Sequence, residues 1–125
     1  MTDTSVWIER LVDSALWQGI ATSWPDREEC VVPTIVQLEL AKWLLRERGE
    51  DVTDQVMAYT QKCVVAALDT PTARLAADIH RQYKMATADA IVYATALRCG
   101  AELLSFDAHF AGLPPVRLYA KQDAP

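Results

Sequence analysis

Length, composition and charge set the first limits on this sequence. It has 125 residues, 51% of them apolar, which is enough for one globular domain with its own core. The net charge of −5 argues against a general nucleic-acid-binding surface, which needs clustered Lys and Arg side chains. No apolar run approaches the ~20 residues of a membrane span, and the N-terminus lacks the basic flank and apolar stretch of a signal peptide. We therefore expect a single cytoplasmic domain over residues 1–125, with no membrane association.

The first half of the chain alternates helical and strand patterns. An imperfect apolar face over residues 4–17 predicts a first helix. The short run at residues 30–32 predicts a strand. The sequence TIVQ at residues 34–37 matches a capping box, which predicts a helix over residues 35–48 that stops at Gly49.

The second half continues the alternation. We expect helices at residues 52–61, 70–83 and 88–99, strands at 64–68, 102–105 and 116–119, and a turn at 110–115. Asp69 is expected to open the second of these helices, with Pro71 in its first turn, and Thr87 to cap the third. Strands that alternate with helices predict an α/β fold, a three-layer α/β/α sandwich with a mainly parallel central sheet.

Four acidic residues fall where a parallel sheet places its functional site, beyond the carboxyl ends of its strands. Asp3 stands at the start of the first predicted helix, and Asp107 follows the strand at residues 102–105. Glu39 and Asp89 lie in the first two turns of helices that begin at the same edge. Because the chain has 17 acidic residues, position alone is weak evidence, and the burial expected around each acid carries the argument.

Asp89 lies in the segment ATADAIVYATA, residues 86–96, which is otherwise mostly apolar and is therefore expected to be buried. An ionised carboxylate there needs a compensating partner, or its pKa shifts until it is neutral. Taken alone, Asp89 is explained by the free N–H groups and dipole at a helix start, and Glu39 by a salt bridge or an edge position. Together with Asp3 and Asp107, they predict a shared divalent cation, because gathered like charges repel.

These acids and their flanking residues resemble the PIN-domain family, in particular the VapC-type toxins of toxin–antitoxin pairs. The resemblance spans almost the whole chain and has four parts in order. They are DTSVWIE (residues 3–9), VQLEL (36–40), TADAIVYATA (87–96) and LLSFDAHF (103–110). Each part contains one of the four acids, and the third is the most specific.

The resemblance implies a metal-dependent endoribonuclease that hydrolyses RNA phosphodiester bonds with Mg²⁺ or Mn²⁺. Asp3 and Asp89 would bind the ion directly, while Glu39 and Asp107 would bind through water, complete a second ion or orient the nucleophile. This chemistry suits carboxylates, because hydrolysis needs an activated water and neutralised phosphoryl charge. The resemblance also implies a homodimer and a small cognate antitoxin that silences the toxin.

One departure concerns the strand that precedes the first Asp in this family. Only Met1 and Thr2 precede Asp3, so we expect a truncated first strand: either the sequence starts inside the natural gene or the strand is unusually short. This keeps open a second interpretation, a catalytically inactive PIN-like binding or scaffold protein. A receiver or phosphatase domain is disfavoured, because Ser5 stands where a phosphatase needs a second acid and no strand-end Lys follows Ser105.

The remaining polar candidates have simpler explanations. His80 and His109 lie far apart without a ligand spacing, so surface or structural roles are expected for both. Ser105 is expected either to donate a hydrogen bond to Asp107 or to a phosphate, or to be an ordinary strand-end hydroxyl.

Overall fold

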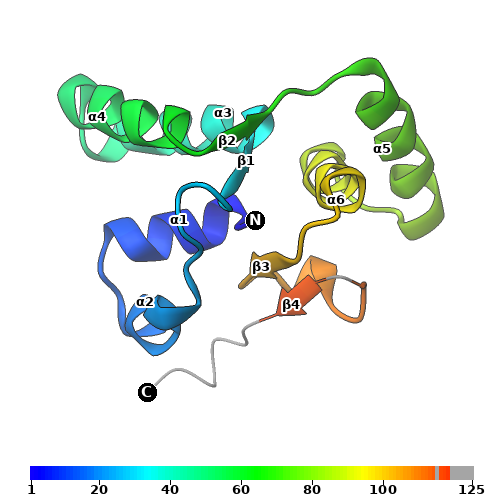
Figure 1. Cartoon of the computed structure of the whole chain (residues 1–125), viewed down its shortest axis with the longest axis horizontal. Helices are drawn as coiled ribbons and strands as arrows, with labels where there is room; N and C mark the ends of the chain where they lie inside the picture. Colours follow the sequence, from blue (N-terminus) through cyan, green and yellow to red (C-terminus); the bar gives the residue numbers. More distant parts are fainter. Residues whose placement is uncertain (115, 119–125) are drawn as a thin grey trace.

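A computed structural model describes residues 1–114 and 116–118 of the chain (Figure 1). The helices are α1 (Thr4–Leu11), α2 (Ala15–Ile20), α3 (Thr34–Glu47), α4 (Glu50–Gln61), α5 (Thr70–Tyr83) and α6 (Thr87–Cys99), with 3₁₀ turns η1 (Ala21–Ser23) and η2 (Ala108–Phe110). The strands are β1 (Val31–Pro33), β2 (Val64–Ala66), β3 (Leu103–Ser105) and β4 (Val116–Leu118). Pro115 and Tyr119, which belong to the last predicted turn and strand, lie outside the described residues.

The strands pair in parallel, as their alternation with helices predicts. The register places Val31 opposite Val64 in the β1–β2 pair and Leu103 opposite Val116 in the β3–β4 pair. The first strand is truncated, as expected, to a single parallel bridge between Thr2 and Leu104. Within the described residues the sheet therefore consists of two strand pairs, with the N-terminal segment alongside β3.

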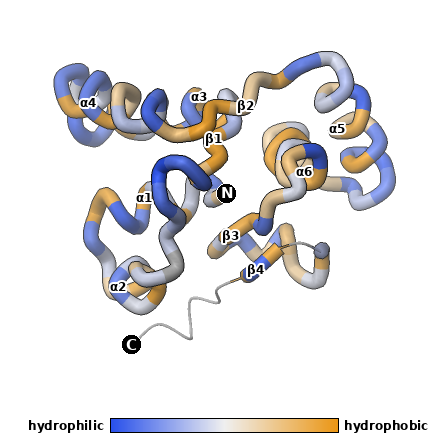
Figure 2. Tube along the Cα trace, in the orientation of Figure 1, coloured by the Kyte–Doolittle hydropathy of each residue, from blue (hydrophilic) through white to orange (hydrophobic). Residues whose placement is uncertain are grey.

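Helix α6 is the most buried helix of the fold. Residues 90–96 are all buried, and α6 packs against α5 and α3. Figure 2 shows α6 as mostly apolar, whereas α5 alternates between polar and apolar residues. The same core contains Met1, Val32 and Leu103, so it joins the N-terminal segment to both strand pairs. The predicted burial of the segment around Asp89 is thus confirmed.

The single helix predicted over residues 4–17 was wrong, because the chain breaks between α1 and α2. Asp13 adopts a left-handed backbone conformation with φ of 51°, and the Ser14 hydroxyl accepts a hydrogen bond from Trp17 N at 3.1 Å. Asp tolerates the left-handed region better than most residues, and Ser is a preferred helix cap. These two local preferences override the continuous apolar pattern.

The predicted capping box was also wrong. Thr34 is the first residue of α3 and its Oγ1 accepts a hydrogen bond from Leu68 N at 3.3 Å, while Gln37 Nε2 donates to Thr60 Oγ1 at 3.1 Å. Thr87 likewise begins α6 without capping it. In α3, partners distant in sequence replace the local bonds that the motif predicts.

Helix α5 begins as predicted, because Asp69 Oδ1 accepts a hydrogen bond from Thr72 N at 3.0 Å and Pro71 lies in the first turn. Helix α6 ends at Gly100, whose φ of 60° is the left-handed conformation that favours glycine at a helix C-terminus. In the part of the chain that is described, no helix is both long and apolar enough to cross a membrane.

Candidate metal centre

Asp3 is buried at the N-terminus of α1, directly after the bridge at Thr2, and is only 6% exposed. Its Oδ1 accepts hydrogen bonds from the Ser5 hydroxyl at 2.5 Å and from Val6 N at 3.3 Å. Burial raises the pKa of Asp3 from 3.8 to about 6, against the lowering effect of these hydrogen bonds, and the charge of Asp107 adds to the rise.

Ser105, at the end of β3, connects Asp3 to Asp107. Its hydroxyl donates to Asp3 Oδ2 and accepts a hydrogen bond from Asp107 N at 2.8 Å. The Ser5 hydroxyl similarly accepts from Phe106 N at 3.2 Å. Two serines therefore fix the end of β3 against the start of α1. The hydroxyl of Ser105 donates to Asp3, not to the Asp107 carboxylate that was one of its predicted partners.

Asp89, Asp107 and His109 form the tightest group. One ligand atom from each lies within 4.8 Å of the others. His109 Nδ1 is 3.4 Å from Asp89 Oδ2 and 3.0 Å from Asp107 Oδ1. The η2 turn creates this arrangement, because Asp107 caps it by accepting from His109 N at 2.9 Å, while α6 supplies Asp89 from its first turn.

Glu39 joins the cluster from α3. It is half-buried, and its Oε1 accepts a hydrogen bond from Thr4 Oγ1 at 2.8 Å, next to Asp3 in the chain. Burial raises the pKa of Asp89, the charges of Asp107 and Glu39 raise it further, and His109 lowers it. The four predicted acids thus come from separate segments to one region and interact, although Asp3 and Glu39 lie outside the 4.8 Å group.

The donor set of this cluster suits a hard divalent cation. Carboxylate oxygens are the protein ligands that Mg²⁺ and Mn²⁺ prefer. Burial raises the pKa of Asp3 and of Asp89, and neighbouring carboxylates add to the rise, so the ionised forms of both acids are disfavoured in the metal-free protein. A cation among the carboxylates would offset both their burial and their mutual repulsion, so the residues fit a divalent metal ion.

Sequence reasoning missed two members of the cluster. His109 was expected in a surface or structural role, yet its exposed ring pairs with both neighbouring acids, and its place two residues after Asp107 was the available signal. Ser5 was considered only as part of the opening segment, where its spacing from the first acid is a weak signal. His80 has the structural role expected of it, because its Nδ1 lies 2.6 Å from Met85 O.

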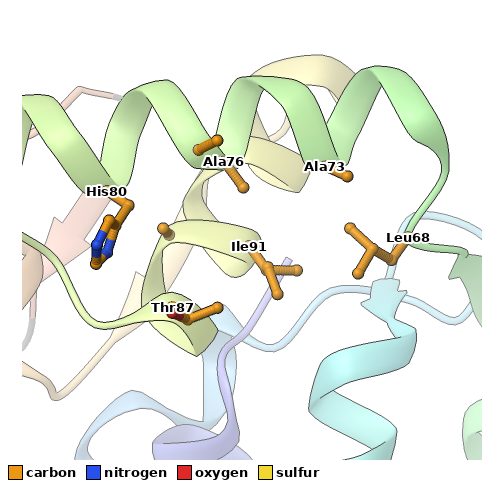
Figure 3. A pocket seen from close by; sticks show the side chains of 8 residues that line it. Leu68, Ala73, Ala76, His80, Thr87 and Ile91 are labelled. Atoms are coloured by element: carbon orange, nitrogen blue, oxygen red, sulfur yellow. The ribbon is translucent and has the colours of Figure 1, made fainter.

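A hollow of about 440 Å³ adjoins the cluster, since His109 lines it, and Lys84 lies in the same lining. Another hollow, of about 340 Å³, lies between α5 and α6 and is lined mainly by apolar side chains. Figure 3 shows it with the His80 ring at one end and Leu68 at the other. The acids of the cluster do not line this second hollow, so it has no part in the candidate metal centre.

The fold and the acidic cluster define an α/β domain with a candidate metal centre, and comparisons identify its family. The model of the PIN domain matches residues 1–114, so the chain belongs to the PIN-domain family. The chain is similar to one in a toxin–antitoxin complex from Klebsiella pneumoniae, with a TM-score of 0.80, 20% identity and 93% of each chain covered.

A second similar structure is that of DNA-bound VapBC from Salmonella typhimurium, with a TM-score of 0.73, 15% identity and 95% of each chain covered. No curated protein matches the sequence. At these identities the two structures establish the shared fold, and the predicted PIN-like α/β/α architecture is confirmed.

Proposed function

We propose that this chain is a Mg²⁺- or Mn²⁺-dependent endoribonuclease and the toxin of a toxin–antitoxin pair. Asp3, Glu39, Asp89 and Asp107 would form the metal site, with Asp3 and Asp89 as direct ligands. The observation that carries the proposal is the coupling of acids from four separate segments through hydrogen bonds and charge. Membership of the PIN-domain family supports nuclease chemistry at this position.

The chain's own residues hold the acids ready for this chemistry. A bound divalent cation neutralises phosphoryl charge and acidifies water, which are the two needs of phosphodiester hydrolysis. Ser5 and Ser105 fix the Asp3 carboxylate, and Thr4 orients Glu39. Because Asp3 is shielded from water, its electrostatic interactions are stronger than those of an exposed carboxylate.

RNA would reach the acids through the hollow of about 440 Å³ that adjoins His109. Lys84 in its lining offers a positive charge to phosphate, and Tyr83 offers an aromatic ring for base stacking. The net charge of −5 disfavours RNA binding over the rest of the surface, so the proposal confines RNA contacts to this hollow and the bound cation.

The proposal includes two protein partners. One similar structure is of a toxin–antitoxin complex and the other of a DNA-bound VapBC complex, which supports a cognate antitoxin for this chain. Leu38 and Leu45, seven residues apart on α3, are 56% and 55% exposed, and this apolar stripe supports a homodimer. Sedimentation equilibrium of the purified chain distinguishes the dimer from a monomer.

The decisive test compares Asp89→Asn with Asp54→Asn, which alters an exposed acid on α4. Purified variants are incubated with total RNA, and new 5′ ends are sequenced in Mg²⁺, in Mn²⁺ and in EDTA. Wild type and Asp54→Asn should cleave only with metal, while Asp89→Asn should be slower by about 10²-fold or more, as for loss of one group that stabilises a transition state. Equal cleavage by both variants would refute the assigned site.

A second candidate function is a PIN-like binding protein that does not cleave. The observation in its favour is the first strand, which is reduced to the single bridge between Thr2 and Leu104. It predicts that wild-type protein binds a protein partner but produces no metal-dependent RNA ends, and the same sequencing experiment separates the two functions.

A further inference from the structure

The last turn of α1 places Arg10 among aromatic rings, at the opposite end of the helix from Asp3. The guanidinium carbon lies 4.4 Å from the ring centroid of Trp24, 5.3 Å from that of Tyr59 and 5.5 Å from that of Trp17. Trp7 packs edge-on against Trp24 and Tyr59, at centroid distances of 4.7 and 5.9 Å. We call these five residues the Arg10 cluster.

Three donors of the Arg10 cluster are buried without an acceptor. They are Arg10 Nη1, Trp7 Nε1 and Trp24 Nε1, and within the described ranges none has a hydrogen-bond partner. Trp7 itself is only 2% exposed. Guanidinium and indole nitrogens donate and cannot accept, and buried donors without acceptors are rare and destabilising. Three of them around one set of rings point to an acceptor that lies outside the described residues.

A pocket of about 180 Å³ opens against the Arg10 cluster. Its lining combines residues of α1 with residues of α4: Trp7, Arg10, Leu11, Gln55, Val56 and Tyr59. Among these lining residues Arg10 alone is charged, and Leu11 and Val56 add aliphatic surface. The volume is smaller than the roughly 300 Å³ of typical small-molecule sites, and it suits one side chain.

We propose that this pocket binds the carboxylate of an Asp or Glu side chain presented by a polypeptide partner. The guanidinium of Arg10 matches a carboxylate in charge and in the geometry of its paired donors. The aliphatic and aromatic walls take the methylene groups and neighbouring apolar residues of the same segment. Pairing with the carboxylate adds a counter-ion to the ring contacts that the described residues make with Arg10.

The lining favours a polypeptide over a nucleic acid. A phosphate backbone is bound by several cationic side chains along a groove, whereas Arg10 is the one cation in the lining of this pocket. An acidic side chain needs a single counter-ion and can insert alone. Charge complementarity therefore selects an acidic segment as the occupant.

This pocket is separate from the candidate metal centre. Arg10 follows Asp3 by seven residues on α1, which corresponds to about 10 Å along a helix. The inference rests on the proposed function only in expecting the antitoxin to be the polypeptide that supplies the carboxylate. The pocket itself can be tested in Asp89→Asn protein, so loss of nuclease activity and loss of peptide binding are distinguishable results.

The test is an NMR titration of the full ¹⁵N-labelled chain, monitored at the Arg10 and Trp7 side-chain N–H signals. The probes are the blocked peptide acetyl-Leu-Glu-Leu-amide, its Leu-Gln-Leu counterpart and a 5′-phosphorylated uridine dinucleotide. We expect the Glu peptide to shift these signals and to bind at least about tenfold tighter than the Gln peptide, the effect of one charge-assisted pair. The dinucleotide should leave them unchanged.

The matched variants are Arg10→Met, which keeps an unbranched side chain against the rings, and Arg46→Met, which removes an exposed α3 arginine that pairs with Glu47. Arg10→Met should lose the preference for Glu over Gln, and Arg46→Met should keep it. If Arg10→Met does not fold, Arg10→Lys should fold and show a smaller preference. Equal binding of both peptides, an unchanged preference in the Arg10 variants, or binding of the dinucleotide alone would overturn the proposal.

Discussion

The two ends of α1 differ in the kind of polar group that lacks a compensating partner among the described residues. At its N-terminus, Asp3 belongs to a cluster of carboxylates in which burial and repulsion raise the pKa of Asp3 and of Asp89. At its C-terminal end, Arg10 and two indole groups present buried donors that find no acceptor within the described residues. The N-terminal region has carboxylate acceptors without enough neighbouring cations. The C-terminal region has donors without acceptors among the described residues.

The uncompensated groups at the two ends of α1 do not serve the stability of the fold, and we interpret them as ligand-binding groups. A chain selected only for stability would pair these groups or replace them with apolar side chains, because unpaired buried polar groups are destabilising. Both clusters adjoin the same hydrophobic core, which contains Trp7 next to Arg10 and the buried residues of α6 next to Asp89. We therefore expect a cation at the N-terminal end of α1, and we propose a carboxylate at the other end.

The largest expected effect tests whether the Trp7 N–H contributes to the fold. Trp7→Ala should lower the free energy of unfolding by about 3–5 kcal/mol, because it empties a large buried volume. Trp7→Phe should cost less than half as much, because it keeps an aromatic ring and removes a donor for which the described part of the chain supplies no acceptor. Urea denaturation measures both values.

The control is Trp43→Phe, a half-buried tryptophan on α3 outside the Arg10 cluster, for which we expect a change below about 1.5 kcal/mol. If Trp7→Phe were as destabilising as Trp7→Ala, the indole N–H would be stabilising the free chain. The C-terminal end of α1 would then not carry the unpaired indole donor that distinguishes it from the N-terminal end.

The second-largest expected effect concerns the charge of Asp3, at the N-terminal end of α1. Its pKa of about 6 exceeds the reference value of 3.8 by about 2 units, which corresponds to at most about 3 kcal/mol at 1.36 kcal/mol per unit. The sign follows from linkage: the folded state holds this proton more tightly, so ionisation of Asp3 destabilises the metal-free fold as pH rises from about 4 to above 6. Below pH 3.8 the penalty is absent.

Asp3→Asn should therefore stabilise the protein in EDTA at pH 7, by up to about 3 kcal/mol less the hydrogen bonds that the amide fails to reproduce. The gain should disappear as the pH falls below about 4. Thermal unfolding of wild type and variant across this range measures it. Asp13→Asn, at an exposed position with a left-handed backbone, is the control and should change stability little at any pH. A destabilised Asp3→Asn at pH 7 would contradict the excess negative charge assigned to this end.

Much of the fold follows from the sequence because local preferences and the global fold agree. Asp69 caps α5 and Gly100 ends α6, each from a residue type whose backbone or hydrogen-bonding preference requires no distant partner. The capping box at Thr34 fails for the opposite reason, since Leu68 and Thr60 lie more than 20 positions away and replace the local partners. Sequence motifs carry no information on such partners.

The candidate metal centre was also predictable from the sequence only in part. The burial of Asp89 could be predicted from its apolar neighbours, and its charge then required compensation. The pairing of His109 with Asp89 could not, because it depends on how the η2 turn projects a side chain that is itself exposed. The pattern over residues 4–17 predicted only an amphipathic helix, since the pocket that side chains of α1 and α4 line together is visible only in the folded chain.

The smallest expected effect concerns His109 and probes the acid cluster without disturbing the core. Because its side chain is 73% exposed, His109→Ala should change the free energy of unfolding by no more than about 0.5 kcal/mol. The same substitution should raise the pKa of Asp89, because it removes a charge and a hydrogen bond that both lower it. A ¹³C titration of the Asp89 carboxyl group in EDTA measures this shift, with His80→Ala as the control that removes a ring bonded to Met85. An unchanged or lowered Asp89 pKa in His109→Ala would show that the imidazole does not offset the charge of Asp89, contrary to the pairing assigned to these two side chains.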